Sequence, residues 1–255
     1  MGKRTEHKPG TFSYVELSTS DADAAKSFYG GLFGWDYEDN PLPEEAGGGV
    51  YSLAKVQGDT AAAIFASDRT PPHWNNYVTV ESAEAAQAKA AELGGTVLME
   101  TMDVMGLGRM AALADPTGGA FMVWEPIKTI GAERVNDPGC LTWNELHTPD
   151  IDAAVEFYTG LFGWETAEMD TGGGPRYIIA KVGDRSNGGI MGAQEGAPAH
   201  WLPYFVVPDR DGAAVGAGEH GGKELMRMEM PMGKIAGIQD PQGAVFAVWE
   251  GQTDD

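Results

Sequence analysis

The chain contains one phrase twice: "GGLFGW" at residues 30–35 returns as "TGLFGW" at residues 159–164. When Tyr14 is set against Trp143, the 22-residue stretches that begin there are identical at 14 positions. Two later blocks follow in the same order, "PHWNNYVTV" over "AHWLPYFVV" and "DPTGGAFMVWE" over "DPQGAVFAVWE". Chance similarity would not preserve this order, so the sequence is an internal duplication whose two halves are expected to share one fold.

Within each half, strand and helix patterns alternate in a fixed rhythm. "FSYVELST" alternates in polarity and predicts a strand, after which Ser20 and Asp21 can cap a helix. Apolar residues then recur at helical spacing until Gly34, which is suited to end the helix, and short strand patterns follow. We expect an α+β fold in which a β-α-β-β-β module occurs twice in each half.

A polar stretch with Pro and Gly at its ends separates the two halves. We expect a flexible N-terminal tail at 1–10, a first domain at 11–127, a linker at 128–138, a second domain at 139–251 and a short tail at 252–255. Since a duplicated chain can imitate the dimer of a shorter protein, we expect a monomer or a weak homodimer.

Charge and composition exclude several classes of function. The net charge of -21 argues against nucleic-acid binding, which needs clustered Lys and Arg. No apolar run approaches a membrane span, and the N-terminus lacks the apolar stretch of a signal peptide. Cys140 is the single cysteine, so no disulfide can form within the chain. These features favour a cytoplasmic protein with no membrane partner.

The "FYxxLFGW" and "DPxG" blocks resemble those of the vicinal oxygen chelate superfamily, which includes glyoxalase I, bleomycin-resistance proteins and extradiol dioxygenases. The tandem form is similar to an actinobacterial branch whose members are described as glyoxalase-like or hydroxylase-like. The resemblance implies that each pair of modules curls into an open β-cup that binds a small molecule. It does not select one activity, because such a fold hosts many functions.

Metal-using members of the superfamily place their ligands at a few inward positions. The resemblance maps these onto segments near Ala62–Ile64 and Gly189–Met191, and onto six single residues: Tyr14, Asn75, Met122, Trp143, Leu202 and Ala247. Metals of this kind need carboxylate or imidazole ligands. Neither half keeps such a set, so we expect no metal cofactor, while a divalent metal is left open.

Other polar residues are expected to face into the cups, because side chains two apart on a strand share a face. The rule places Glu16 beside Tyr14, and places Glu145 and His147 beside Trp143. On the strand that opens the second module of each half, the same rule predicts three residues that face into the cup. These are His73, Asn75 and Tyr77 in the first half, and His200, Leu202 and Tyr204 in the second. Glu16 would then pair with His73, and Glu145 with His200.

Three interpretations of these residues stay open. The two glutamates can be structural, each bonded to neighbouring groups. Glu145 can instead be a general base, with His147 or His200 as an acid or polar anchor. The third interpretation, a metal site of Glu145, His147 and His200, has the least support, because Glu145 and His147 share one strand.

Aromatic residues at the inward positions suit a flat, largely apolar ligand. The predicted ligand-binding residues are Trp143, Tyr204, Tyr177, Tyr14, Glu16, His73, Asn75, Tyr77 and Met122. Methionines before the last strands, such as Met226 and Met228, can adapt to varied ligands. The second half is preferred for the ligand because it carries both His147 and His200.

Two main functions follow from this site. The first is metal-free binding of a flat aromatic molecule, such as a natural product or antibiotic. The second is a hydroxylase-like or isomerase-like enzyme on an aromatic natural product, using Glu145 with His147 or His200. Weaker alternatives are a metal-dependent lyase or dioxygenase, and a regulatory protein with a vestigial site.

Overall fold

The computed structural model describes residues 2–44, 48–68 and 71–253. Four modules follow one another, each with a strand, a helix and three strands, which confirms the predicted rhythm. The first half comprises β1 (Phe12–Thr19), α1 (Ala22–Phe33), β2 (Asp36–Pro41), β3 (Val50–Val56), β4 (Asp59–Ala66), β5 (His73–Thr79), α2 (Ala83–Glu92), β6 (Thr96–Asp103), β7 (Gly108–Ala114) and β8 (Ala120–Pro126). The second half comprises β9 (Leu141–Thr148), α3 (Ile151–Phe162), β10 (Glu165–Glu168), β11 (Tyr177–Val182), β12 (Arg185–Gly192), β13 (His200–Val206), α4 (Arg210–Glu219), β14 (Lys223–Met230), β15 (Gly233–Gln239) and β16 (Val245–Gly251).

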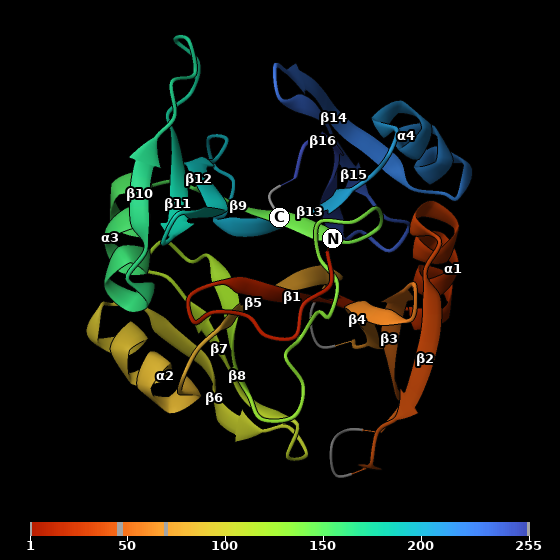
Figure 1. Ribbon diagram of the computed structural model, residues 1–255, viewed down its shortest axis with the longest axis horizontal. Helices are drawn as coiled ribbons and strands as arrows, with labels where there is room; N and C mark the ends of the chain where they lie inside the picture. Colours follow the sequence, from red (N-terminus) through yellow and green to blue (C-terminus); the bar gives the residue numbers. More distant parts are fainter. Residues whose placement is uncertain (1, 45–47, 69–70, 254–255) are drawn as a thin grey trace.

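Each half forms one open sheet of eight strands, in agreement with the predicted α+β cups (Figure 1). The strand order is β2-β3-β4-β1-β5-β8-β7-β6 in the first cup and β10-β11-β12-β9-β13-β16-β15-β14 in the second. The opening strands of the two modules pair antiparallel at the centre of each sheet, and each also pairs parallel with the last strand of its own module. This register places Glu16 opposite Asn75, and His147 opposite His200.

The helix ends follow the capping residues seen in the sequence. The side chain of Asp21 accepts a hydrogen bond from the backbone of Ala24, and Asp150 does the same for Ala153. Both helices of this type end at a glycine in the left-handed conformation, Gly34 with φ of 70° and Gly163 with φ of 68°. Because a side chain at that φ would be strained, these glycines stop the helices and turn the chain toward the next strand.

The two faces of the central strands carry different side chains. On β1, Val15 and Leu17 are fully buried in a core that includes helix residues, while Tyr14 belongs to a separate cluster on the opposite face. We call the face turned away from the helices the inner face of each cup. The alternation confirms that Tyr14 and Glu16 share the inner face, and Trp143 and Tyr204 take the corresponding positions in the second cup.

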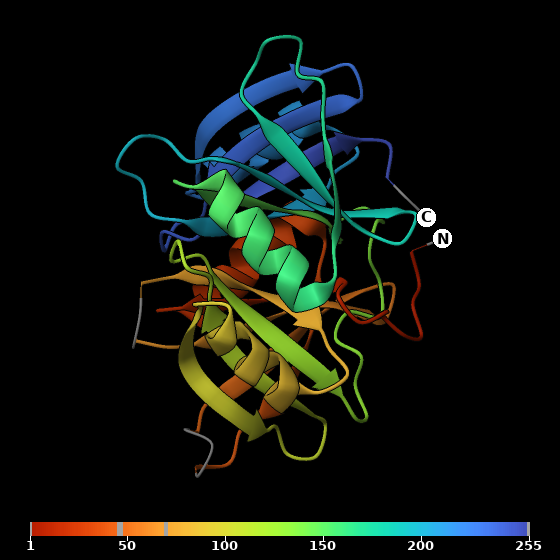
Figure 2. The same ribbon diagram turned by 90° about the vertical axis from the view of Figure 1, so that its left-hand side faces the viewer.

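The repeated phrases meet at the contact between the two halves. Helix α1 packs against α4, and α2 against α3, as Figures 1 and 2 show. Tyr29 of the first "FYxxLFGW" block donates to Asp240 of the second "DPxG" turn at 2.9 Å, and Tyr158 donates to Asp115 of the first turn at 2.9 Å. Each copy of the phrase therefore binds the other half, and the two contacts are reciprocal.

The tryptophans that end the phrases make a second reciprocal pair of contacts. Trp35 Nε1 donates to the carbonyl of Gly139 at 2.8 Å, and Trp164 Nε1 donates to the carbonyl of Gly10 at 2.7 Å. Both tryptophans are buried. The duplication thus builds one interface from two equivalent sets of contacts.

The segment that joins the halves runs along the first cup. Ala132 is fully buried in the inner-face cluster with Tyr14, and its backbone N–H bonds to the carbonyl of Ser13 at 2.9 Å. The N-terminal segment pairs with it through a bridge between Lys3 and Arg134. The part of residues 1–10 that the structure describes is therefore packed against the chain, whereas the sequence predicts a flexible tail there. Residues 254–255 of the predicted C-terminal tail lie outside the described residues.

The helices in the described ranges have 10 or 12 residues, and none is long and apolar enough to cross a membrane.

Candidate functional site

Glu145 lies at the centre of the inner face of the second cup and is 6% exposed. Its Oε1 accepts hydrogen bonds from Tyr204 at 2.7 Å and from His147 Nε2 at 2.8 Å, and its Oε2 accepts one from Tyr177 at 2.8 Å. These donors come from β13, β9 and β11, so the carboxylate joins three strands. A buried carboxylate with three donors is well satisfied and orders the side chains around it.

The electrostatics of Glu145 favour the charged form. Burial raises the pKa of its carboxyl, but His147, Tyr204 and Tyr177 together outweigh burial, and the pKa lies below its usual value. The same burial and the nearby carboxylate raise the pKa of Tyr177 and Tyr204 well above the usual phenol range. At neutral pH the site therefore holds one carboxylate and two neutral phenols.

Two imidazoles lie beside this carboxylate. The rings of His147 and His200 stack with centroids 5.0 Å apart and an angle of 12° between their planes. His200 Nδ1 is 3.0 Å from the carbonyl of Pro198, which can only accept, so that nitrogen carries a proton. In the same way, His147 Nε2 carries the proton that it donates to Glu145.

The predicted group of Glu145, His147 and His200 is thus brought together, but not with the predicted pairing. The sequence predicts that Glu145 pairs with His200, whereas the imidazole bonded to it in the structure is that of His147. The strand register explains the difference, because Glu145 lies opposite Leu202 while His147 lies opposite His200.

The first cup contains a related arrangement around Glu16, which is 9% exposed. Tyr51 and Tyr77 donate to its two oxygens at 2.6 and 3.0 Å, and Asn75 Nδ2 donates at 3.3 Å. Asn75 Oδ1 is 3.2 Å from His73 Nε2, so the predicted pairing of Glu16 with His73 runs through this amide. Burial raises the pKa of Glu16 despite these donors, opposite to the shift at Glu145.

Aromatic and apolar side chains surround the two carboxylates. Trp143 Nε1 donates to the Tyr177 hydroxyl at 3.0 Å, which links the tryptophan to the Glu145 network. In the first cup the Tyr14 hydroxyl is 3.4 Å from that of Tyr51. All nine residues predicted to bind a ligand lie on strands of the two cups: Tyr14, Glu16, His73, Asn75, Tyr77, Met122, Trp143, Tyr177 and Tyr204.

The two inner faces differ in how far they are already filled. In the first cup Tyr14, Met122 and Trp124 are all buried, and Ala132 packs among them. In the second cup Trp143, Leu202 and Trp249 are only half-buried, and Ala247 stands where the first cup has Met122. The second cup therefore leaves more of its aromatic surface accessible.

Methionines extend the apolar surface of the second cup along its edge strand. Met226 lies opposite Gly237, and Met228 lies opposite Ile235, which belongs to the inner-face cluster. Both are exposed, at 42% and 45%, although they adjoin an apolar cluster. Unbranched, exposed methionines on this edge strand form a surface that can adapt to a ligand.

No group of three or more His, Cys, Asp or Glu residues within 2–44, 48–68 and 71–253 is arranged to hold a metal ion. The inward positions mapped from the metal-using relatives carry Tyr14, Met122, Trp143 and Ala247, whose side chains are phenol, thioether, indole and methyl. These donor types do not fit a borderline divalent metal.

Two parts of this architecture lie outside the predicted site residues. Tyr51 of β3, which corresponds to Tyr177 in the second half, donates the shortest bond to Glu16. Arg210 is 1% exposed and donates to the carbonyl of Ile235 at 3.0 Å and to Glu229 at 3.0 Å. A single arginine at a helix start gives no signal of burial in the sequence.

Comparison with known proteins agrees with this geometry. A family model described as "Glyoxalase/Bleomycin resistance protein/Dioxygenase superfamily" matches residues 11–123, and one described as "Bleomycin resistance protein-like N-terminal" matches residues 141–174. "Putative glyoxylase CFP32" of Mycobacterium tuberculosis (strain CDC 1551 / Oshkosh) is 42% identical over 256 residues, covering 97% of each chain. "Anthracycline biosynthesis protein DnrV" of Streptomyces peucetius is 35% identical over 266 residues, covering 96% of this chain and 95% of that protein.

Solved structures show the same fold at low sequence identity. A Mn(II)-bound glyoxalase from Novosphingobium aromaticivorans has a TM-score of 0.67 at 16% identity, covering 100% of this chain and 85% of the other. A catechol 2,3-dioxygenase has a TM-score of 0.65 at 13% identity, covering 97% and 94%. With the nearly full-length relatives and the matching family models, these findings show that the chain belongs to the glyoxalase/bleomycin resistance/dioxygenase superfamily.

Proposed function

We propose that this protein binds a flat, largely aromatic small molecule on the inner face of the second cup, against Trp143, without a metal. The observation that carries the proposal is the half-buried indole of Trp143 beside a fully satisfied polar cluster. An aromatic surface with a few fixed polar groups is the usual composition of a small-molecule site. Among the relatives, one is named for anthracycline biosynthesis, and anthracyclines are flat polycyclic compounds.

The polar cluster supplies orientation in this proposal. Glu145 fixes Tyr177 and Tyr204, and Tyr177 in turn accepts from Trp143, so the indole has a defined direction. The rings of His147 and His200 lie next to the same face, and their other nitrogens can meet the hydroxyl groups of a phenolic ligand. A prearranged wall of this kind lowers the cost of ordering side chains on binding.

The choice of the second cup rests on its accessible surface. In the first cup the chain itself covers the equivalent surface, because Ala132 and Tyr14 are buried in one cluster. In the second cup Trp143, Leu202 and Met230 are only partly buried. A ligand that contacts them would remove apolar surface from water, which favours binding.

The proposal is tested by titrating the protein with alizarin, a planar dihydroxyanthraquinone, in equilibrium dialysis. We expect saturable binding of one alizarin per chain. Glu145→Gln keeps the shape of the site and removes the charge, so a binding protein should retain most of its affinity. The absence of saturable binding to alizarin and to related polycyclic phenols would contradict the proposal.

A second candidate is acid–base catalysis on an aromatic natural product, and the bond between Glu145 and His147 favours it. A carboxylate that accepts from an imidazole N–H fixes one tautomer and stabilises the imidazolium form. Since the pKa of Glu145 is lowered, its carboxylate is a weak base, and His147 through Nδ1 would be the proton acceptor.

The two candidates predict different behaviour of His147→Gln. If His147 moves a proton, the variant should still bind its ligand but lose turnover by about 100-fold or more, the usual contribution of a general base. If the protein is only a binder, wild type should leave the ligand chemically unchanged, which chromatography of the dialysed ligand would show.

A further inference from the structure

A row of neighbouring inner-face residues crosses the second cup from its central strands to its edge. The strand register places these residues side by side along the row: Trp143 of β9, Tyr204 of β13, Ala247 of β16, Gly237 of β15 and Met226 of β14. Side chains that lie opposite each other on adjacent strands project from the same face of a sheet. The row therefore continues the surface around Trp143 toward the edge of the cup.

The first cup has an equivalent row with larger side chains at its centre. Its members are Tyr14, Tyr77, Met122, Ala112 and Met99. The second cup has a methyl group where the first has the Met122 thioether, and a hydrogen where the first has the methyl group of Ala112. The centre of the row in the second cup therefore carries less side-chain volume.

The backbone does not require the glycine in this row. Gly237 lies inside a strand and is not among the glycines with a positive φ. The edge strand β14 shifts its register beside Gly237, but β6 of the first cup has the same shift beside Ala112. Since the shift is compatible with a methyl group, it does not explain the glycine. A glycine inside a strand also marks places where another group approaches the sheet closely.

The Met226 side chain occupies the space above Gly237 in this structure. A Cβ placed on Gly237 would lie 2.8 Å from Met226 Cγ and 3.5 Å from its sulfur. Met226 is nevertheless 42% exposed, whereas Gly237 and Ala247 are buried. An unbranched side chain of this kind is flexible, so it can leave the glycine without disturbing the core.

The length of the row favours a ligand of several rings. Gly237 lies three strand spacings from Trp143, which is about 14 Å at roughly 4.7–4.9 Å each. A single aromatic ring against Trp143 does not cover that distance, whereas fused rings along the row approach the glycine. We propose that Ala247 and Gly237 form the floor beneath a ligand of several fused aromatic rings, and that Met226 moves aside to admit it. This inference rests on the binding function proposed above and adds the residues that select the ligand by its length.

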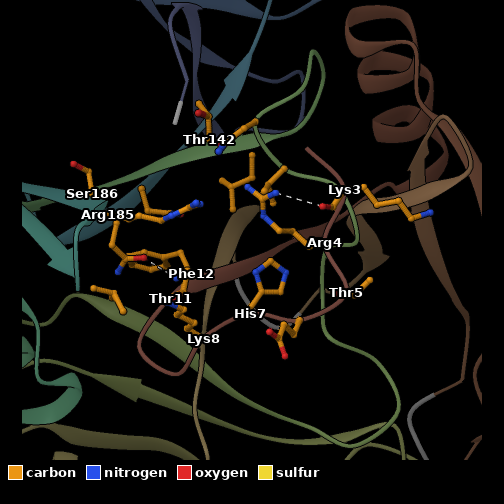
Figure 3. A pocket seen from close by; sticks show the side chains of 17 residues that line it. Lys3, Arg4, Thr5, His7, Lys8, Thr11, Phe12, Thr142, Arg185 and Ser186 are labelled. Atoms are coloured by element: carbon orange, nitrogen blue, oxygen red, sulfur yellow. Dashed lines mark hydrogen bonds between the residues drawn. The ribbon is translucent and has the colours of Figure 1, made fainter. Parts of the chain in front are cut away.

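A separate pocket lies outside the row. Its volume is about 420 Å³, it lies between the N-terminal segment and the second half, and Figure 3 shows Thr142 on its wall. Thr142 precedes Trp143 on β9, so the two side chains project from opposite faces of the strand. None of the residues in the row lines this pocket, so substitutions in the row distinguish binding in the cup from binding in the pocket.

The floor is tested by equilibrium dialysis of alizarin against Gly237→Val, with Ala112→Val as the matched control in the first cup. Gly237→Val fills the space assigned to the ligand, so we expect the affinity for alizarin to fall by about tenfold or more. Ala112→Val should leave the affinity unchanged. Gly237→Ala adds only the methyl group that the first cup already carries, so it should fold, as its melting temperature will show, and still weaken binding measurably.

Catechol and the Met226 methyl group supply two further measurements. Catechol carries the adjacent hydroxyl groups of alizarin on a single ring, so wild type should bind it about tenfold or more weakly, because it covers less apolar surface. In NMR spectra of protein labelled in its methionine methyl groups, alizarin should shift the Met226 resonance, which Met226→Leu identifies. The resonance of Met102, an exposed methionine on β6 of the first cup, should not shift.

The outcomes separate this inference from the function on which it rests. If wild type does not bind alizarin saturably, the binding function is contradicted and the floor with it. If wild type binds alizarin but both substitutions of Gly237 leave the affinity unchanged, the floor is overturned while the binding function stands. The same holds if catechol binds as tightly as alizarin, or if the Met226 resonance does not respond. Alizarin binding that neither Gly237→Val nor Trp143→Ala changes would place the ligand outside the cup, as in the pocket of Figure 3.

Discussion

Replacing Tyr158 by Phe should weaken the contact between the two halves. The Tyr158 hydroxyl is buried, donates to Asp115 at 2.9 Å and accepts from Trp201 Nε1 at 2.8 Å. The substitution leaves the Asp115 carboxylate and the Trp201 indole N–H without the Tyr158 hydroxyl as a partner. Each such loss costs about 1–3 kcal/mol, so we expect the free energy of unfolding to fall by about 2–6 kcal/mol. For a chain of this size, at about 2–4 °C per kcal/mol, that corresponds to a drop in melting temperature of roughly 4–24 °C.

Urea unfolding followed by tryptophan fluorescence measures this loss, with Tyr37→Phe as the matched control. The Tyr37 hydroxyl is buried and has no hydrogen-bond partner among the described residues, so its removal should change stability by less than about 1 kcal/mol. Tyr29→Phe should resemble Tyr158→Phe, since Tyr29 binds Asp240 and Trp74 in the same way. Equal and small effects of all three substitutions would refute the role assigned to the repeated phrase.

Three further predictions concern titration and metal content. Because the folded-state pKa of Glu145 is lowered, its charge stabilises the fold above the usual pKa of a glutamate, and this stability is lost as the pH falls through the lowered pKa. The folded-state pKa of Glu16 is raised, so its contribution to stability is instead lost as the pH rises through the raised pKa. Glu145→Gln should therefore lower the melting temperature more at pH 7 than Glu16→Gln does, and the opposite order in thermal melts would contradict these shifts. Burial raises the pKa of the Cys140 thiol to about 12, so Ellman's reagent should react with it only upon unfolding, and rapid reaction of the folded protein would count against this. Purified protein should contain no stoichiometric zinc, nickel, iron or manganese by mass spectrometry, and a chelator should leave its melting temperature unchanged. If the protein instead holds one metal ion per chain, and Glu145→Ala loses that ion, Glu145 is a metal ligand.

The modules and the inward positions could be predicted because they depend on local rules. The alternation on β1 and β9 determines which side chains share a face, and a cap such as Asp21 marks where a helix begins. The strand β2 was not identified from its residues, although the module rhythm required a third strand. Its sequence "DYEDNP" lies at the edge of the sheet and is largely exposed, so it carries no apolar alternation.

Contacts between distant segments could not be predicted from the same patterns. The repeat indicates that Tyr29 and Asp240 belong to related blocks, but only the packing of α1 against α4 brings them together across 211 residues. The polar N-terminal residues are typical of a flexible tail in sequence. In the structure they are held in place because Lys3 pairs with Arg134 of the segment that joins the halves. In the candidate site, register decided that His147 is the imidazole bonded to Glu145.

Equilibrium dialysis of alizarin against Trp143→Ala and against Tyr14→Ala shows directly which cup binds the ligand and whether the indole carries the binding. Trp143 is half-buried in the second cup, whereas Tyr14 is 9% exposed in the first. If a ligand covers about 60–100 Å² of the indole, its loss costs roughly 1.5–2.5 kcal/mol at about 25 cal/mol per Å². We therefore expect Trp143→Ala to weaken alizarin binding by about tenfold or more, at about 1.4 kcal/mol per factor of ten, and Tyr14→Ala to weaken it less. Alizarin binding that survives Trp143→Ala unchanged, or that depends more on Tyr14, would contradict it.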